Sequence, residues 1–206
     1  MTSIHIVAGG QFGSEGKGAF TAALVRKLRQ EFDVHPTLVR VAGPNAGHTA
    51  YDDQGRKWSL RQIPVGAVVD HESDIIIGQQ SEIDLEVLRS EIDQLEEAGI
   101  SILNRLSIDH ACTVIESWHQ ERELTISTGT TGKGIGGARA ARLMRTAGTM
   151  RDLAPPDLPI GDTVAALRAT GWGQHIVIEG TQGYGLGLHT SYYPYVTSSN
   201  TRCGDF

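Results

Sequence analysis

The chain has 206 residues and a formal net charge of −6, from 18 basic and 24 acidic side chains. This length fits one large domain, residues 1–206, with a buried core, and the acidic balance argues against a nucleic acid or a membrane as the main partner. Two cysteines cannot build a disulfide framework, the eight histidines lack zinc-site spacing, and no apolar run approaches the roughly 18 residues of a membrane span, so we expect a cytoplasmic protein.

The first predicted elements enclose a glycine-rich loop. Ile4–Ala8 fits a buried strand, and apolar residues at every fourth position from Phe20 to Phe32 indicate a helix. The loop between them, residues 9–18, directs backbone N–H groups and a helix N-terminus at an anion, and Lys17 adds a positive charge. Its spacing is not that of a standard P-loop, which has another glycine and a Ser or Thr after the lysine. We expect a P-loop-like nucleotide-binding loop after the first strand, with a purely structural turn as the alternative.

A second loop of small residues follows the next predicted strand. Thr37–Val41 fits this strand, and Ala42–Thr49 follows at its end, where open α/β sheets bind ligands. His48 is the candidate functional residue in this loop, with a structural or solvated histidine as the alternative. Residues 51–57 have the polar character of a hairpin tip.

Strands and helices then alternate, which predicts a mainly parallel central sheet flanked by helices. Asp74–Gly78 and residues 100–108 fit strands, and residues 81–98 and 112–124 fit helices. The acidic side chains of the first of these helices are interpreted as its solvated face: Glu82, Asp84, Glu86, Glu91, Asp93, Glu96 and Glu97.

Two more glycine loops occupy the last part of the chain. Residues 127–137 combine hydroxyls, glycines and a lysine, the groups of an anion-binding site, and lie beside a basic cluster that is either an exposed helix or a phosphate contact. This cluster consists of Arg139, Arg142, Arg145 and Arg151. A proline-rich linker, residues 154–159, leads to a predicted helix at 162–169. A buried strand, His175–Glu179, then opens into the loop 180–185.

Five motifs, in order along the chain, resemble those of the adenylosuccinate synthetase family. They are Gly13–Gly18, Asn45–Thr49, Gly129–Gly136, Glu179–Gly183 and Tyr193–Asn200. The resemblance covers essentially the whole chain. It implies a carbon–nitrogen ligase in which a nucleoside triphosphate, with Mg²⁺ as cofactor, phosphorylates O6 of a purine monophosphate. The amine of L-aspartate then displaces the phosphate at C6.

The resemblance also assigns roles to particular residues. Ser14, Lys17, His48 and Gln182 take the catalytic positions, and the carbonyl of Gly47 together with Ser14 would contact Mg²⁺. The donor triphosphate would be held by Gly13, Ser14, Glu15, Gly16, Lys17, Gly18, Gly47, His48 and Thr49. The purine monophosphate would be held by Ser14, Asn45, Ala46, Thr130, Thr131, Gln182 and Thr197, and by Arg145 of the neighbouring subunit in a homodimer.

Position 14 departs from the family. Its members carry an aspartate there that acts as general base on purine N1, and Ser14 cannot do so near neutral pH. The serine, Pro44 and a short connection between Asp152 and His175 resemble the phage branch of 2-aminoadenylosuccinate synthetases, which implies dGMP as substrate, ATP or dATP as donor and a host cytoplasm. The alternative is an ordinary synthetase that uses IMP and GTP.

The length departs from the family as well. The chain ends soon after Thr201, and the family's C-terminal half carries the donor-base and aspartate contacts. A non-catalytic nucleotide-binding module is therefore a further alternative, and an ordinary P-loop phosphotransferase is the least favoured one.

Overall fold

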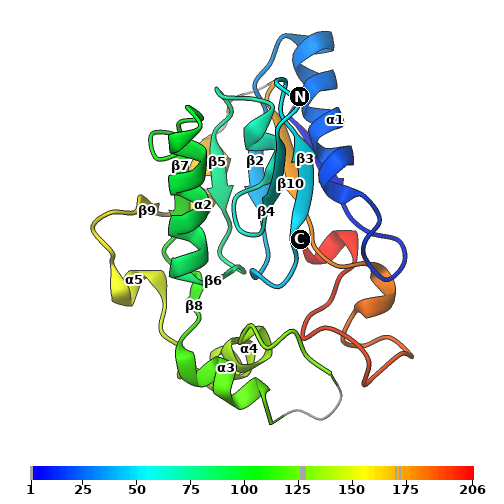
Figure 1. Ribbon diagram of the computed structural model, residues 1–206, viewed down its shortest axis with the longest axis vertical. Coiled ribbons are helices and arrows are strands. Elements are labelled where there is room, and N and C mark those ends of the chain that lie inside the picture. Colours follow the sequence, from blue (N-terminus) through cyan, green and yellow to red (C-terminus); the bar gives the residue numbers. More distant parts are fainter. Residues whose placement is uncertain (1, 126–128, 170, 172) are drawn as a thin grey trace.

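A six-stranded parallel sheet forms the centre of the protein (Figure 1). The computed structural model describes residues 2–125, 129–169, 171 and 173–206. The strand order is β1-β10-β2-β5-β7-β9, and each neighbouring pair is parallel. These strands are β1 (Ser3–Val7), β2 (Thr37–Arg40), β5 (Ile75–Ile77), β7 (Leu106–Asp109), β9 (Ile160–Gly161) and β10 (His175–Glu179). The predicted mainly parallel α/β fold is confirmed.

Six helices, two small two-stranded units and three 3₁₀ turns surround the sheet in the described part of the chain. The helices are α1 (Lys17–Phe32), α2 (Leu85–Glu97), α3 (Ser117–Glu123), α4 (Ile135–Met144), α5 (Met150–Leu153) and α6 (Thr163–Ala169). The small units pair β3 (His48–Tyr51) with β4 (Lys57–Leu60), and β6 (Glu82–Ile83) with β8 (Thr113–Val114). The 3₁₀ turns are η1 (Val65–Val68), η2 (Tyr184–Leu186) and η3 (Cys203–Asp205).

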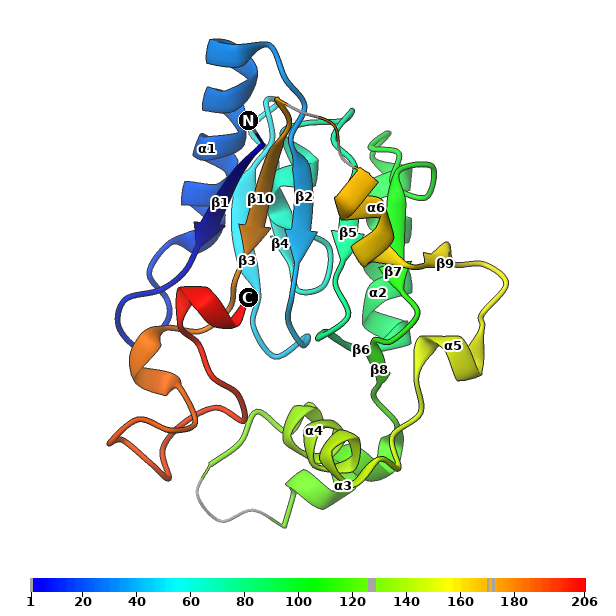
Figure 2. The ribbon, with the colours of Figure 1, turned by 180° about the vertical axis from the view of Figure 1, so that it is seen from behind.

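The two faces of the sheet are covered unequally. Helices α1 and α2 and the β3–β4 hairpin lie on one face (Figure 1), where the larger apolar cluster includes Val25, Leu38 and Ile75. On the opposite face α6 lies over β5 and β7, while β1 and β10 face the viewer (Figure 2). The core on that face is small: Val39, Ile76 and Ile176 are buried, with Leu167 of α6 packed against them.

The position of β10 brings the glycine loops together. This strand comes last in the sequence but lies between β1 and β2, so the loops that follow β1, β2 and β10 leave from adjacent strand ends. Helices α3 and α4 lie beyond the same ends of the strands (Figure 2). A crevice at the carboxyl ends of parallel strands is where open α/β sheets bind ligands.

The buried faces of the first strand and helix differ from the prediction. Ile4 and Ile6 of β1 are 61% and 39% exposed, because β1 is an edge strand with one little-covered face. Phe20 and Phe32 of α1 are also exposed, whereas Leu28 of the predicted face is buried, together with Ala22 and Val25. Residues four apart drift by about 40° per step around a helix, so a strict fourfold spacing cannot stay on one face.

Three predicted boundaries are wrong as well. Of residues 100–108, only the last part is strand (β7), while Ile100 and Ile102 are buried in the connection before it. The predicted helix at 112–124 is β8 followed by α3. His48 and Thr49 begin β3 rather than lying in a loop.

Three of the acidic residues assigned to a solvated face are structural. Glu82 is buried and forms an ion pair with Arg139, at 2.6 Å. Asp84 caps α2 by accepting the N–H of Glu86 and of Val87. The burial of Glu82 had no signature in the local pattern, because its partner Arg139 comes from a distant segment.

Glu91 is the third of these carboxylates. It is 6% exposed and accepts the backbone N–H groups of Arg61, Gln62 and Ile63, at 2.6, 3.0 and 3.0 Å. Burial raises its pKa, and the three amide bonds oppose that shift. Glu91 thus holds the segment that follows β4 against α2.

We expect Glu91→Ala to lower the free energy of unfolding by about 3 kcal/mol, because it leaves three buried amides without an acceptor. Urea denaturation at neutral pH measures this loss. The control is Glu97→Ala on the exposed face of the same helix, with an expected change below about 0.5 kcal/mol. An equal effect of the two substitutions would contradict the structural role of Glu91.

Candidate active site

Two adjoining cavities lie at the carboxyl ends of the strands. The first, of about 440 Å³, is lined by residues 12–18, 45–49 and Gln182. The second, of about 530 Å³, is lined by Asn45 and Gln182 and by residues of the segments 123–136 and 186–198. Asn45 and Gln182 line both cavities and therefore mark their junction.

The loop after β1 folds around one of its own carboxylates. Glu15 accepts the N–H groups of Gly10, Gln11 and Gly13 at 2.9, 3.0 and 3.1 Å. Desolvation alone would raise the pKa of Glu15, but these bonds and the charge of Lys17 hold it below its ordinary value. Glu15 is thus a stable carboxylate that fixes the loop.

The same loop carries an unusual backbone at Ser14. Its φ of 53° lies in the left-handed region, which Asn and Asp adopt more readily than other residues with a side chain. The side chain of Ser14 is exposed and lines the first cavity. A strained, accessible residue in a cavity is a candidate for function.

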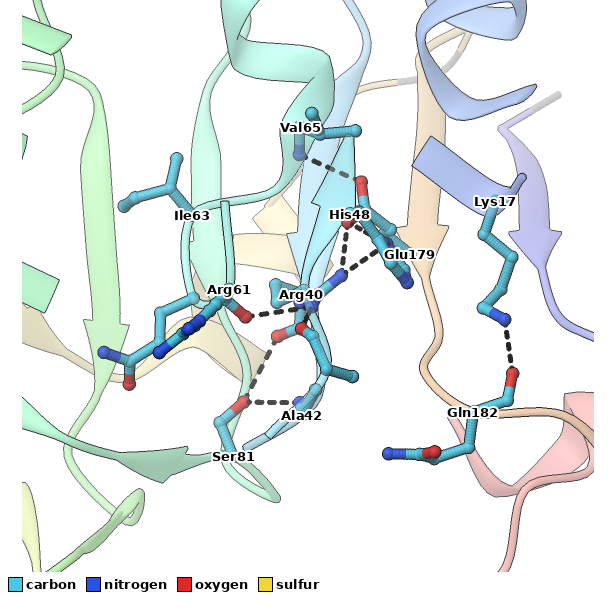
Figure 3. Close-up of polar contacts among 12 residues, drawn as sticks. Lys17, Arg40, Ala42, His48, Arg61, Ile63, Val65, Ser81, Glu179 and Gln182 are labelled. Carbon is cyan, nitrogen blue, oxygen red and sulfur yellow. Dashed lines mark hydrogen bonds and ion pairs between the residues drawn. The ribbon is translucent and has the colours of Figure 1, made fainter. Parts of the chain in front are cut away.

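Lys17 is the first residue of α1 and is 6% exposed. Its ammonium group donates to the backbone carbonyl of Gln182, which joins the first loop to the loop after β10 (Figure 3). Burial lowers the pKa of Lys17, with Glu15 opposing and Arg40 adding to that shift. Gly18 permits this position, because a Cβ there would lie 2.7 Å from the backbone nitrogen of Thr49.

His48 is held by a buried ion pair. Arg40, at the end of β2, and Glu179, at the end of β10, are 0% and 1% exposed and face each other in register (Figure 3). Nδ1 of His48 lies 2.6 Å from Oε1 of Glu179 and 2.7 Å from a guanidinium nitrogen of Arg40. Of these two neighbours only the carboxylate can accept a hydrogen bond, so Nδ1 carries its proton toward Glu179 and Nε2 is the nitrogen left for a ligand.

The environment of His48 favours the neutral form of its ring. Burial lowers its pKa, Arg40 and Lys17 add to that shift, and the hydrogen bond to Glu179 opposes it. Burial would raise the pKa of Glu179, but Arg40 and His48 hold it below its ordinary value. An anion bound beside Lys17 would favour the charged imidazolium, which can donate from Nε2.

The third glycine loop is also folded around a carboxylate. Glu123 is 3% exposed and accepts from the hydroxyl of Thr130 at 2.9 Å and from the N–H groups of Gly134 and Gly136. These donors belong to the loop and to the start of α4. Ser127 and Thr128, also assigned to this loop, lie outside the described residues.

The structure brings most of the predicted site residues together. All nine residues assigned to the donor triphosphate line the first cavity: Gly13, Ser14, Glu15, Gly16, Lys17, Gly18, Gly47, His48 and Thr49. Ala46 lines it too. Of the residues assigned to the purine monophosphate, Asn45, Thr130, Thr131, Gln182 and Thr197 line the second cavity.

The basic cluster is dispersed. Arg139 pairs with Glu82, while Arg142, Arg145 and Arg151 are exposed. Arg145 caps the C-terminal end of α4 and is not among the residues lining either cavity. Its assignment to a phosphate therefore stays a prediction.

Sequence reasoning missed Arg40, Glu179 and Glu123 as side chains that build the site. A signal existed for two of them, because Arg40 and Glu179 each end an otherwise apolar strand. Charged residues at the carboxyl ends of two buried strands are expected to meet if the strands are neighbours. The adjacency of β2 and β10 was not readable from the sequence.

Comparison with known proteins identifies the family. The model of the adenylosuccinate synthetase family matches residues 6–159. The synthetase of Thermococcus onnurineus is 36% identical over 203 residues, which are 96% of this chain and 58% of that protein. The synthetase of Methanococcus vannielii is 36% identical over 98% of this chain and 59% of its own length. This chain belongs to the adenylosuccinate synthetase family.

Two solved structures share the fold. The succinoaminodeoxyadenylate synthetase (PurZ) of cyanophage S-2L, bound to dGMP and dATP, is 26% identical, with a TM-score of 0.81 over 98% of this chain. Adenylosuccinate synthetase from Plasmodium falciparum has the same TM-score at 22% identity. The matched part is 57% of each structure, so this chain spans little more than half of the family's length.

The family implies Mg²⁺, and the residues of the first cavity fit it. Ser14 and Gly47 line this cavity, and a hydroxyl and a backbone carbonyl are oxygen donors of the kind that Mg²⁺ prefers. Among the described residues, no group of three or more His, Cys, Asp or Glu forms a metal site. The donor set therefore suits an ion that arrives with a triphosphate, whose oxygens supply most of the charge.

The described helices include none that is long and apolar enough to cross a membrane.

His48 should make stability depend on pH. Its pKa in the folded protein is below 6.5, so the unfolded chain binds this proton first as the pH falls, and stability decreases from pH 6.5 down to the folded pKa. We expect His48→Gln to reduce that slope, by at most about 1.4 kcal/mol per pH unit, in urea denaturation between about pH 5.5 and 7.5. The exposed His71→Gln is the control. An unchanged slope in His48→Gln would exclude a neutral, buried His48.

Proposed function

We propose that this protein is a carbon–nitrogen ligase that condenses L-aspartate with a purine nucleoside monophosphate, preferentially dGMP, to give N6-succino-2-amino-2′-deoxyadenylate. The energy comes from a nucleoside triphosphate, ATP or dATP, with Mg²⁺. One observation carries the proposal. All nine residues assigned to the donor line the first cavity, and residues assigned to the monophosphate line the second. The two cavities meet at Asn45 and Gln182.

The arrangement suits transfer of a phosphoryl group across the junction. Lys17 and the amides of the first loop hold the donor phosphates, and the hydroxyl of Ser14 and the carbonyl of Gly47 hold the metal ion. Mg²⁺, when bound, neutralises charge on the transferred phosphate. O6 of the purine attacks the γ-phosphorus, the nucleoside diphosphate leaves, and the charge that develops near O6 is stabilised by His48 through Nε2. Removing such a donor costs roughly 10²–10³-fold in rate.

The second step forms the new bond. The amine of aspartate attacks C6, and inorganic phosphate leaves from the same carbon. Asn45, Thr130, Thr131, Gln182 and Thr197 hold the nucleotide during both steps. Phosphorylation is needed because an unmodified carbonyl oxygen is a poor leaving group.

The proton on purine N1 must also be removed. Glu15 does not suit this task, since three amides hold its carboxylate and its pKa is below the ordinary value. We assign the transfer to a water molecule bound by the hydroxyl of Ser14, a residue that lines the first cavity, and this water passes the proton to an oxygen of the donor's phosphates.

The preference for dGMP rests on Ser14. Serine is smaller than aspartate and leaves room for the 2-amino group of guanine. The cyanophage relative, whose structure contains dGMP and dATP, supports this choice. Identity of 36% to ordinary synthetases favours IMP as the alternative substrate, but one position in contact with the base changes substrate preference without altering overall identity.

The decisive assay gives the full-length gene product Mg²⁺, ATP and L-aspartate with either dGMP or IMP, and detects the succinylated nucleotide by mass spectrometry. We expect product from dGMP, and we expect Ser14→Asp to shift the ratio of kcat/KM toward IMP by at least tenfold, because the carboxylate fills the space beside the 2-amino group. Ser14→Ala is the control for loss of the hydroxyl without added volume.

Each other result has a definite meaning. Product from IMP alone would make the protein an ordinary synthetase, and an unchanged substrate ratio in Ser14→Asp would exclude the steric explanation. Nucleotide binding without product from either substrate would identify a non-catalytic module, which the short span of the chain keeps as the second candidate.

We also propose that the enzyme is a homodimer in which Arg145 binds the 5′-phosphate in the partner's site. Arg145 is exposed, lies outside the cavities of its own chain, and follows two exposed apolar residues, Leu143 at 84% and Met144 at 74%. Exposed leucine and methionine beside an arginine are typical of an interface.

Mixed dimers test this arrangement. Arg145→Ala and His48→Ala subunits are each expected to be nearly inactive, whereas random mixing should restore about a quarter of the wild-type activity, from one working site in each heterodimer. Mixing His48→Ala with the double variant His48→Ala/Arg145→Ala restores no site and is the control. No recovery in proven heterodimers would place Arg145 outside the site.

A further inference from the structure

The loops that follow β1 and β10 are joined through their backbones. Tyr184 donates its N–H to the carbonyl of Gly9 at 2.9 Å, and Gly185 donates to the carbonyl of Gln11 at 2.7 Å. Gly183 permits this approach, because a Cβ at that position would lie 2.6 Å from the carbonyl oxygen of Gln11. Each loop therefore fixes the position of the side chains on the other.

Leu186, the last residue of η2, is held in this arrangement. Its N–H donates to the carbonyl of Gly183 at 2.9 Å, and its carbonyl accepts the N–H of Thr197 at 2.8 Å. Leu186 lines the second cavity, and its Cδ1 lies 3.9 Å from the place that a Cβ on Gly13 would take. Gly13 lines the first cavity. Leu186 therefore lies at the boundary between the two cavities.

Packing in the core does not explain this leucine. Leu186 is half-buried and belongs to neither of the two apolar clusters of the described residues. The residues that line both cavities, Asn45 and Gln182, are polar. Ligand sites combine a few polar groups, which orient the ligand, with apolar side chains that cover it. An aliphatic side chain fixed beside these polar groups is suited to cover the flat ring of a bound base.

In the proposed function, O6 of the purine reaches the donor phosphates across this boundary. A base that extends from the second cavity toward Ser14 passes Gly13 and therefore contacts Leu186. We propose that Leu186 packs against the purine base at the junction of the cavities and excludes water from the phosphoryl group as it passes to O6. This inference rests on the proposed function and adds a residue that acts in the same site.

Water at the junction would compete in both chemical steps. Its oxygen could attack the γ-phosphorus in place of O6, so that the nucleoside diphosphate leaves, inorganic phosphate forms and one proton is released. Water could also attack the phosphorus of the 6-phosphoryl intermediate. The bond from phosphorus to O6 then breaks, O6 keeps the electron pair and N1 regains a proton, which returns the monophosphate. Both routes consume triphosphate without forming product, and enzymes prevent such losses by excluding water from the site.

The test compares the phosphate released with the succinylated nucleotide formed by the full-length gene product, given Mg²⁺, ATP, L-aspartate and either dGMP or IMP. We expect equal amounts from the wild type. Leu186→Ala should release at least about threefold more phosphate than product, because the truncated side chain admits water beside the base. Leu186→Asn, which has a similar size but a polar surface, should do the same. Leu186→Met keeps an apolar side chain and should restore equal amounts.

The matched control is Leu188→Ala, because Leu188 also lines the second cavity but lies beyond η2. This variant should keep phosphate and product equal, and circular dichroism checks that every variant is folded.

Equal amounts of phosphate and product from folded Leu186→Ala and Leu186→Asn would overturn the inference and leave the proposed function intact. The same excess of phosphate from Leu188→Ala would overturn it too, since any loosening of the cavity would then admit water. If the wild type forms no succinylated nucleotide from dGMP or from IMP, the proposed function fails, and this inference fails with it.

Discussion

The buried ion pair between Arg40 and Glu179 is the interaction on which the site depends. It joins the ends of β2 and β10 and holds Nδ1 of His48 (Figure 3). Arg40 also donates to the carbonyls of Ala46 and Arg61, and Glu179 accepts the N–H of Val65. Two connecting segments, the one that contains Ala46 and the one from Arg61 to Val65, are therefore tied to one pair of charges. Burying two ions costs several kcal/mol each unless their hydrogen-bonding groups find partners, and this need specifies how the segments are arranged.

Two glutamates give the first and third glycine loops their shape. Glu15 gathers the amides of the first loop, and Glu123 gathers donors of the third loop and of the start of α4. Each carboxylate accepts some of the loop N–H groups that could otherwise bind an anion. The remaining N–H groups of the loop stay in fixed positions. Loops ordered in this way lose little conformational entropy when a ligand binds, which favours affinity. The same engagement disfavours Glu15 as the base of the proposed reaction.

Family membership is read from most of the chain, whereas substrate choice depends on a few residues. Residues 6–159 match the family model, and identity of 36% to archaeal synthetases reflects the common sheet and loops. Substrate preference depends on the few side chains that touch the base. Ser14 has a left-handed backbone and an exposed hydroxyl in the first cavity. The backbone conformation is one that aspartate adopts readily, so a change between serine and aspartate alters the chemistry of the site with little effect on the fold.

The sequence by itself determined the local structure and the family. Periodicity predicted β10 and α2, and the five motifs indicated the family, because these signals lie within short segments. Only the tertiary structure decided which charges are buried and which apolar residues are exposed. Glu91 lies on a helix that appears uniformly acidic on one face, yet amides from the segment after β4 enclose it. Ile4 and Ile6 have a core pattern, yet they lie at the edge of the sheet. Glu179 and Arg40 are 139 residues apart and meet because β10 lies beside β2. The environment of a side chain depends on which strands become neighbours, and strand order arises from long-range packing that no local pattern records.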